Sequence, residues 1–297
     1  MLPLNLEGLG VALATPFNTD FSIDYNSLER LINFVIDGGI DYIVVLGTTA
    51  ETPTLTLKEK NDVAAFIKNV TAGRLPLVIG IGGNNTMGVI DEIKSRDLDG
   101  FDAILSVVPY YNKPNQEGIF QHFALIEDNS PLPILLYNVP GRTGVNMSAE
   151  TTLRLAEYSS KFCGVKEASG SLSQSEIIIK KAPSNFKVIS GDDSLIAPLM
   201  MKGAKGVISV LANACPSIVK KLITLCNKGE FDKAINLQAS LNPLISHLFE
   251  DGNPAGVKAL LSNMGLAKNI LRLPLVPVSK GVEEKILNKS SEIKLLK

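Results

Sequence analysis

Short apolar runs recur along this 297-residue chain, and most of them are separated by a stretch with helical periodicity. The runs predict eight buried strands, at 8–17, 42–49, 75–83, 103–111, 133–140, 162–169, 187–193 and 206–211. Repeated strand–helix units of this number are typical of a closed barrel, whereas an open doubly wound sheet has about five or six strands and would leave units over. We therefore predict an α/β fold, a (β/α)8 TIM barrel.

The segments between the runs have the pattern of amphipathic helices. After the first run, apolar residues follow the helical spacing and a glycine pair ends it: Leu28, Leu31, Ile32, Val35 and Ile36, then Gly38 and Gly39. After the eighth run, Pro216 suits a helix start and Gly229 a helix end. The pattern then stays helical at 231–250, 254–265 and 280–291. We predict a barrel domain with the active site at 1–228 and a C-terminal helical domain at 229–297.

The net charge and the pattern of cysteines indicate which binding partners and which cellular compartment to expect. The net charge is −1 and no long basic run occurs, so neither nucleic acid nor an anionic membrane surface is expected as a partner. No apolar run approaches the ~20 residues of a membrane span, and the first residues lack the pattern of a signal peptide. Cys163, Cys215 and Cys226 form no Cys-x-x-Cys pair and are expected as free thiols. These features favour a cytoplasmic protein.

No metal or nucleotide cofactor is expected from the sequence. His122 and His247 are far apart and each lies in a helical pattern, which is not a ligand spacing. Asp192 and Asp193 follow a predicted strand, where an aspartate more often caps the next helix than binds a metal. The segment GIGGNN at 80–85 lacks the last glycine of a dinucleotide loop and follows the third strand rather than opening a βαβ unit.

A lysine stands near the end of the sixth apolar run, where an ammonium group is costly to bury. Lys166 lies in FCGVKEASG, residues 162–170. Burial disfavours the charged form of an amine, and a neutral amine in a protected pocket attacks carbonyl groups, as Schiff-base catalysis requires. The alternative is a lysine that extends from a strand end to solvent. The residues at the ends of the other predicted strands decide between a catalytic lysine and a solvent-exposed one.

Polar side chains also end the neighbouring runs, in LGTTAE (46–51), PYYNKP (109–114), YNVPGRTG (137–144) and SGDD (190–193). In a barrel these ends share one face, which carries the active site. There Thr48 and Thr49 can bind a small carboxylate. Tyr137 can move protons beside Lys166, and Arg142 offers a planar fork to a second carboxylate.

Each of these residues also has an ordinary structural interpretation. Threonines at strand ends favour β structure or cap helices. Tyr110 and Tyr111 can be packing or interface aromatics, and Arg142 can be a solvated residue of a turn. Because all of them are predicted on one barrel face, we favour a common site.

The motifs occur together, in the order found in one family. With GTTAE at 47–51, PYYNKP at 109–114, YNVPGRTG at 137–144 and GVKEASG at 164–170, the chain resembles the 4-hydroxy-tetrahydrodipicolinate synthase (dihydrodipicolinate synthase) family of the pyruvate-dependent class I aldolase superfamily. The resemblance covers essentially the whole length, including NPAGVK at 253–258. The lysine motif marks the superfamily. The GRTG motif and the threonine pair favour the synthase over the sialic acid lyase.

The resemblance implies a lyase that condenses pyruvate with L-aspartate 4-semialdehyde in lysine and diaminopimelate biosynthesis. Lys166 would form a Schiff base with pyruvate, and the derived enamine would attack the aldehyde. The implied catalytic residues are Lys166, Tyr137, Thr49 and Tyr111. The implied substrate-binding residues are Thr48, Thr49, Arg142, Gly191 and Ile208, the last through its backbone carbonyl.

The resemblance also implies a homotetramer, a dimer of dimers, in which Tyr111 reaches into the neighbouring subunit's site. No metal or organic cofactor is implied. Inhibition by L-lysine is expected to be weak. Asn84 matches the inhibitor site of regulated relatives, but Gly88 stands where they have a glutamate, and Leu57 and Lys60 stand where histidine is common.

Two other functions stay open at this point. An N-acetylneuraminate lyase-like or other pyruvate-dependent sugar-acid aldolase would share Lys166 and Tyr137 and would differ in the second-substrate pocket, where Arg142 suits a short acidic aldehyde. A catalytically inactive family member that serves as a binding scaffold is the third possibility. The joint presence of the residues named above argues against it.

Overall fold

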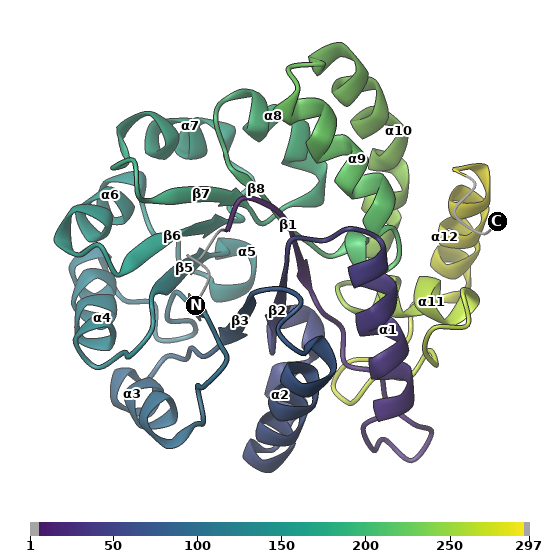
Figure 1. Cartoon of the computed structure of the whole chain (residues 1–297), viewed down its shortest axis with the longest axis horizontal. Helices are drawn as coiled ribbons and strands as arrows, with labels where there is room; N and C mark the ends of the chain where they lie inside the picture. The colour runs from purple at the N-terminus through teal and green to yellow at the C-terminus, as the bar shows by residue number, and fades with distance from the viewer. Residues whose placement is uncertain (1–5, 294–297) are drawn as a thin grey trace.

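The computed structural model describes residues 6–293, and in them eight parallel strands form a closed ring with helices around it (Figure 1). The strands are β1 (Gly8–Ala12), β2 (Tyr42–Val45), β3 (Leu77–Gly80), β4 (Ala103–Val107), β5 (Ile134–Asn138), β6 (Phe162–Glu167), β7 (Lys187–Ser190) and β8 (Gly206–Ser209). Their order around the ring follows the chain, and β8 pairs with β1 to close it. The predicted barrel is confirmed.

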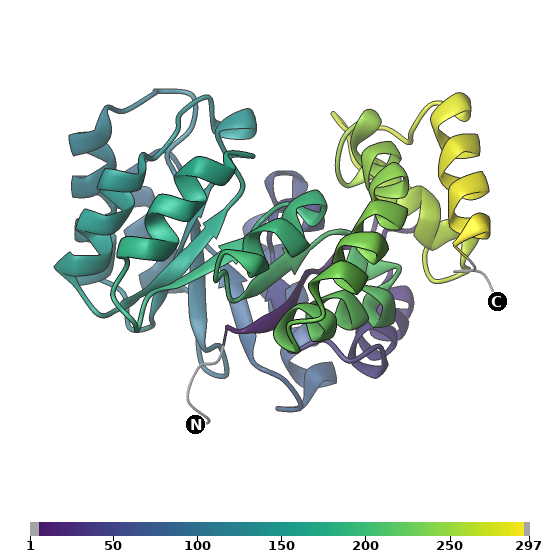
Figure 2. The ribbon, with the colours of Figure 1, turned by 90° about the horizontal axis from the view of Figure 1, so that it is seen from above.

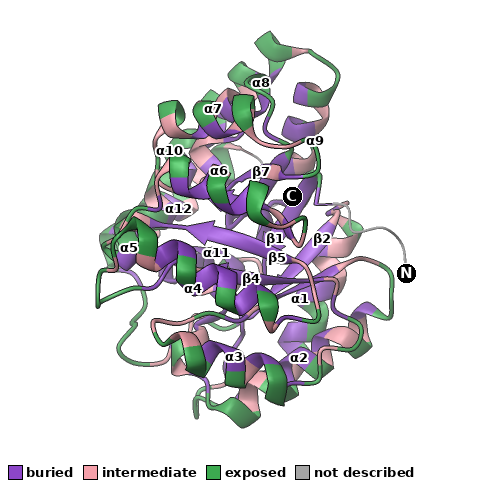
Figure 3. Cartoon of the chain, turned by 90° about the vertical axis from the view of Figure 1, so that its left-hand side faces the viewer, coloured by how far each residue is buried: buried purple, intermediate pink, exposed green. Residues whose placement is uncertain are grey.

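Helices cover the outside of the ring, so the strands are buried on both faces (Figure 3). They are α1 (Tyr25–Asp37), α2 (Leu57–Thr71), α3 (Thr86–Ser95), α4 (Gln116–Asp128), α6 (Ala149–Tyr158), α7 (Leu172–Lys181), α8 (Ile196–Met201) and α9 (Pro216–Asn227). Polar caps start most of them by accepting a backbone N–H of the first turn: Asp24, Thr56, Asn85, Asn115, Ser148 and Ser171. Local sequence therefore fixes where these helices begin.

The strands end earlier than the apolar runs suggested. After β2, Leu46 has φ 56°, and the chain turns into the short 3₁₀ helix η1 (Thr48–Ala50) instead of extending to residue 49. After β5, the expected turn at GRTG is a single helical turn, α5 (Pro140–Thr143). The apolar run continues past the strand in such places because the residues that follow the strand are also buried. Burial alone therefore does not mark the end of hydrogen bonding.

Two groups of buried apolar side chains pack on the two faces of the sheet. One fills the barrel interior and includes Val44, Leu135 and Ile208. The other lies between the strands and the helices, and it continues into the C-terminal helices through residues such as Leu241 and Leu260. The barrel and the C-terminal segment thus share a continuous buried cluster.

The C-terminal segment consists of α10 (Phe231–Glu250), α11 (Ala255–Asn263) and α12 (Lys280–Glu292), close to the three predicted helices. Figure 2 shows them gathered at one end of the molecule. The division into domains at 1–228 and 229–297 stays a prediction, and its outermost residues, 1–5 and 294–297, lie outside the described part. Within residues 6–293, no helix is both long and apolar enough to cross a membrane.

One joint of the ring differs from the rest. The register between β7 and β8 runs through the single pair Ser190 and Val207, whereas five residue pairs join β5 to β6. A side chain supplements this joint. Asp193, in the 3₁₀ helix η3 (Asp193–Leu195), accepts hydrogen bonds from the Ser209 hydroxyl at 2.5 Å and from the next two backbone N–H groups at 2.9 and 3.0 Å. Asp193 therefore links β7 to the segment that follows β8.

Candidate active site

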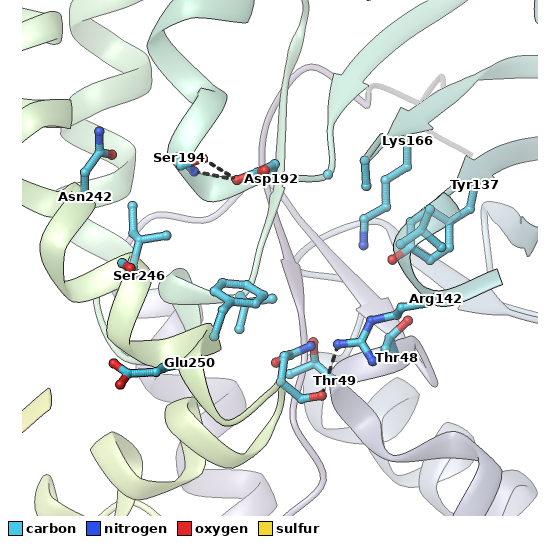
Figure 4. Close-up of a pocket in the computed structure, with 17 residues that line it drawn as sticks. Thr48, Thr49, Tyr137, Arg142, Lys166, Asp192, Ser194, Asn242, Ser246 and Glu250 are labelled. Carbon is cyan, nitrogen blue, oxygen red and sulfur yellow. Dashed lines mark hydrogen bonds between the residues drawn. The ribbon is translucent and has the colours of Figure 1, made fainter. Parts of the chain in front are cut away.

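A cavity of about 730 Å³ opens where the carboxyl ends of the strands meet α10 (Figure 4). It is lined by Thr48, Thr49, Tyr137, Val139, Arg142, Lys166, Ala168, Gly191, Asp192, Ser194, Val210, Asn242, Ile245, Ser246, Phe249, Glu250 and Asn253. Six of the eight residues predicted for the site are in this lining. This is the face of a barrel on which active sites are found.

Lys166 and Tyr137 lie side by side because their strands are hydrogen-bonded neighbours. They are direct register partners on β6 and β5, and alternation of side chains along a strand turns both into the barrel mouth. Lys166 Nζ lies 4.3 Å from the centroid of the Tyr137 ring, and the residues are only 4% and 7% exposed. A buried amine thus faces the cavity next to a phenol.

The threonine pair belongs to η1, directly after β2. Thr49 is 1% exposed, and its Oγ1 accepts a hydrogen bond from Asn253 Nδ2 at 3.1 Å. Thr48 also lines the cavity. Two left-handed residues, Leu46 and Glu51, bracket the segment and turn it across the end of the strand. The two hydroxyls and the backbone around them form a neutral polar site suited to a carboxylate.

Arg142 contributes a positive charge beside the threonine pair. It lies in α5, its side chain is directed toward Thr48 and Thr49 in Figure 4, and its Nη2 donates to the carbonyl of Asn253 at 3.2 Å. A second hollow of about 360 Å³ shares Thr48, Tyr137 and Arg142 with the first. The guanidinium thus stands between the two and can bind a second carboxylate.

Gly191 lines the cavity beside Lys166 and has no room for a side chain. A Cβ there would lie 2.6 Å from Ala168 Cβ and 3.1 Å from Lys166 Cγ. Ile208 is 1% exposed and packs in the barrel interior. Ile208 is absent from the cavity lining, so the role expected of its backbone carbonyl stays a prediction.

Tyr111 is, with Ile208, one of the two predicted residues that are absent from the cavity lining. It is 88% exposed and lines neither hollow, although the adjacent Tyr110 lines the smaller one. Its backbone has φ 73°, a left-handed conformation that is uncommon for an aromatic residue. The surrounding loop is ordered by Asn84, whose Nδ2 donates to the Tyr110 carbonyl at 3.1 Å. A structured loop therefore presents Tyr111 to the outside.

The acidic pair after β7 has structural partners. Asp192 caps η3 by accepting from the Ser194 N–H at 2.8 Å, as its position predicted. Asp193 joins β7 to the end of β8, and burial raises the pKa of its carboxyl group. Among residues 6–293, no three histidine, cysteine or acidic side chains come together as a metal site.

The thiol near the lysine is not a competing nucleophile. Cys163 packs toward the barrel interior and donates to the Ile134 carbonyl at 3.3 Å. Burial raises the pKa of Cys163 to about 12, so the thiolate is not accessible near neutral pH. The side-chain amine of Lys166 thus faces the cavity without a thiolate that could compete with it.

The sequence reasoning missed the wall that α10 contributes. Asn242, Ser246 and Glu250 are four residues apart and face the cavity from the side opposite Lys166 (Figure 4). This spacing of polar residues along one face of an amphipathic helix was a usable signal. Asn253, which contacts both Thr49 and Arg142, was seen only as part of a motif. Its position depends on the packing of the C-terminal helices, which the sequence pattern did not reveal.

Comparisons with known proteins agree on one family. The model of the dihydrodipicolinate synthetase family matches residues 5–293. The 4-hydroxy-tetrahydrodipicolinate synthase of Parabacteroides distasonis is 52% identical over 96% of both chains, and that of Phocaeicola vulgatus is 50% identical over 99% of both. The crystal structure of dihydrodipicolinate synthase from Thermotoga maritima superimposes with a TM-score of 0.95 at 38% identity, covering 98% of this chain and 99% of that one.

Proposed function

This chain belongs to the dihydrodipicolinate synthetase family, and we propose that it acts as a 4-hydroxy-tetrahydrodipicolinate synthase, a lyase of lysine and diaminopimelate biosynthesis. Its substrates are pyruvate and L-aspartate 4-semialdehyde. The observation that carries the proposal is the buried Lys166 amine, held 4.3 Å from the Tyr137 ring centroid at the base of a cavity that also holds Thr48, Thr49 and Arg142.

The first stage joins pyruvate to the enzyme. The Lys166 amine attacks the keto carbon, and loss of water gives an imine. Tyr137 passes protons to and from the carbinolamine, in a hydroxyl relay with Thr49 and Tyr111. Thr48 and Thr49 hold the pyruvate carboxylate. Gly191 and the Ile208 carbonyl line the pocket next to the lysine.

The second stage forms the carbon–carbon bond and the ring. Loss of a methyl proton converts the imine into an enamine, which attacks the aldehyde carbon of the second substrate. Arg142 binds the carboxylate of that substrate. Its amine then adds to the imine carbon and displaces Lys166, so the cyclic product leaves and the free amine is regenerated. One water is released overall, and the reaction needs no oxidant or reductant. The proposal uses no metal or organic cofactor.

The proposed assembly is a homotetramer built as a dimer of dimers. The feature that supports the dimer within it is Tyr111, which is exposed on an ordered loop and is absent from the lining of its own chain's cavity. A second copy related by twofold symmetry can receive this hydroxyl at its own site. We further propose a cytoplasmic location and the division into a barrel, 1–228, and a helical extension, 229–297.

Reduction with borohydride in the presence of pyruvate tests this function. The expected product is a pyruvate-derived adduct on Lys166, found by intact mass and peptide mapping, and turnover is expected with aspartate semialdehyde. Lys166→Ala should lose both. The matched control is Lys161→Ala, because Lys161 lies at the opposite end of the same strand and donates to the Glu127 and Ser130 carbonyls. An adduct on another lysine, or cleavage of N-acetylneuraminate in place of the condensation, would contradict the proposal.

A further inference from the structure

An ion pair lies fully buried behind the threonine pair. The side chains of Lys258 and Glu51 are 1% and 0% exposed, and the ammonium donates directly to the carboxylate. Lys258 Nζ also donates to the Ile270 carbonyl at 2.9 Å and lies 4.1 Å from the centroid of the Phe17 ring. The second carboxylate oxygen accepts the Arg272 N–H at 3.0 Å. Both charges are thus enclosed by polar or aromatic partners.

Such a pair is a costly way to stabilise a fold. Desolvation of two charges can exceed their attraction, and an apolar replacement of both partners is often neutral or stabilising. Burial lowers the pKa of Lys258 to about 8, which reflects the same cost. Neither residue lines the cavity, so neither contacts a substrate there. The presence of the buried ion pair is therefore better explained by a role other than stabilising the fold.

Its position in the chain supplies one. Glu51 follows Thr49 by two residues and has φ 55°, so it sets the turn that carries the threonine pair. Lys258 lies on α11, the helix that begins just after Asn253. Asn253 donates to the Thr49 hydroxyl and accepts from Arg142. Helix α11 and the residues just before it therefore hold the threonine segment at two points, through Asn253 at the hydroxyl and through Lys258 at the turn.

We propose that Glu51 and Lys258 are positioning residues that fix the Thr48–Thr49 segment against α11, so that its hydroxyls meet the carboxylate of the keto acid. The inference rests on the proposed function. It adds that the C-terminal helices act on substrate binding by holding the threonine segment in place. A displacement of about 1 Å caused by a residue far from the chemistry can cost roughly 10²-fold in rate, so a pair outside the cavity can still control how well pyruvate is placed for reaction with Lys166.

The test separates positioning from stability by removing one charge or both. The variants are Lys258→Met, Glu51→Gln and the double variant that combines them; the glutamine side chain still offers an acceptor to the Arg272 N–H. Each is measured for thermal midpoint and for the pyruvate concentration that gives half-maximal borohydride trapping on Lys166. The matched control is Lys220→Met, which removes a 2.6 Å ion pair with Asp41 at the opposite end of β2.

The single variants should lower the midpoint, because each leaves a buried charge unpaired. The double variant should recover most of the midpoint and still need about tenfold more pyruvate, since the two-point attachment is lost. Lys220→Met should leave the pyruvate requirement unchanged. Glu51→Asp keeps the charge and shortens the side chain, and a several-fold increase is expected from it even if the double variant fails to fold.

An unchanged pyruvate requirement in the folded variants would overturn the inference, because it would make the pair a purely structural feature. If the unaltered chain is still trapped on Lys166, that result supports the proposed function even though this inference fails. Absence of an adduct in the unaltered chain is a different result, which overturns the proposed function and this inference with it.

Discussion

At the scale of single residues, the contact between Lys166 and Tyr137 follows from strand pairing. Both residues are fixed by the register of β5 and β6, which are buried on both faces, and not by a mobile loop. This is why the contact was predictable from the sequence: adjacent strands in a barrel are neighbours in space, and strand ends align at one face. Tyr111 could not be placed in this way, since it lies on an exposed loop after β4 and no strand register fixes its side chain.

The hydroxyl of Tyr137 is expected to matter for proton transfer and little for folding. Tyr137→Phe should lower kcat by roughly 10²–10⁴-fold, the range for loss of a general acid–base group, with little change in thermal midpoint. Steady-state kinetics and a thermal melt check this. The matched control is Tyr42→Phe, which removes another buried tyrosine hydroxyl of the barrel interior, one without a hydrogen-bond partner among residues 6–293. A Tyr137→Phe variant with unaltered kcat would exclude the relay.

A second residue-scale prediction concerns acid sensitivity. His122 on α4 is buried, and burial lowers its pKa to about 4. The unfolded chain, with a histidine pKa near 6.5, therefore binds more protons between those values, and the free energy of unfolding falls by up to about 3 kcal/mol as the pH drops from 6.5 to 4. In His122→Gln this contribution should disappear.

Urea unfolding at several pH values in this window measures the effect. The advantage of the unaltered chain over His122→Gln should shrink as the pH falls. His247→Gln is the control, because His247 lies partly exposed on α10 beside Glu250. A stability difference that is independent of pH between 6.5 and 4 would contradict the prediction.

At the scale of elements, the apolar runs predicted every strand but overestimated how far each extends. Leu46 and the residues of η1 remain buried after the ladder of β2 has ended, so hydrophobicity did not signal the turn. The same applies to the site. Residues at strand ends were found because their motifs adjoin the runs, whereas the wall formed by α10 depends on how a distant helix packs over the barrel mouth. Long-range packing of that kind leaves no periodic trace near the strands.

The close approach of β6 and β7 gives an element-scale prediction. Gly191→Ala would place a Cβ 2.6 Å from Ala168 Cβ and 3.1 Å from Lys166 Cγ. Overpacking of this kind should lower the free energy of unfolding by about 1–3 kcal/mol and slow imine trapping, because Lys166 must move. Gly141→Ala is the matched control near the same mouth, since its Cβ would meet no atom within 4 Å. Wild-type trapping and stability in Gly191→Ala would refute the steric argument.

At the scale of the whole molecule, the site is shared among parts that are distant in sequence. Arg142 and Thr49 both contact Asn253, which is 111 and 204 residues away from them. The barrel alone therefore does not complete the mouth, and the C-terminal helices belong to the same working unit. In the proposed assembly, the exposed Tyr111 would extend this dependence to a second copy of the chain.

Mixing two inactive variants tests whether Tyr111 acts across the interface. Tyr111→Phe and Lys166→Ala are each expected to be nearly inactive. Random exchange of subunits in a symmetric dimer should restore up to about a quarter of normal activity, because a mixed dimer has one site with both native groups. Mixing Tyr137→Phe with Lys166→Ala is the control, and it should restore none. No recovery in the first mixture, despite exchange shown by mass spectrometry, would exclude a shared site.

The sparse pairing between β7 and β8 determines where the native barrel opens transiently. With one register pair and the Asp193 side chain across it, separating these strands breaks fewer backbone hydrogen bonds than separating β5 from β6. Transient openings follow the least stable seam of a structure. Deuterium should therefore enter the amides on both sides of this joint ahead of those on β5 and β6. The strand pair that holds Lys166 beside Tyr137 would stay closed while the ring opens two strands further along, between β7 and β8.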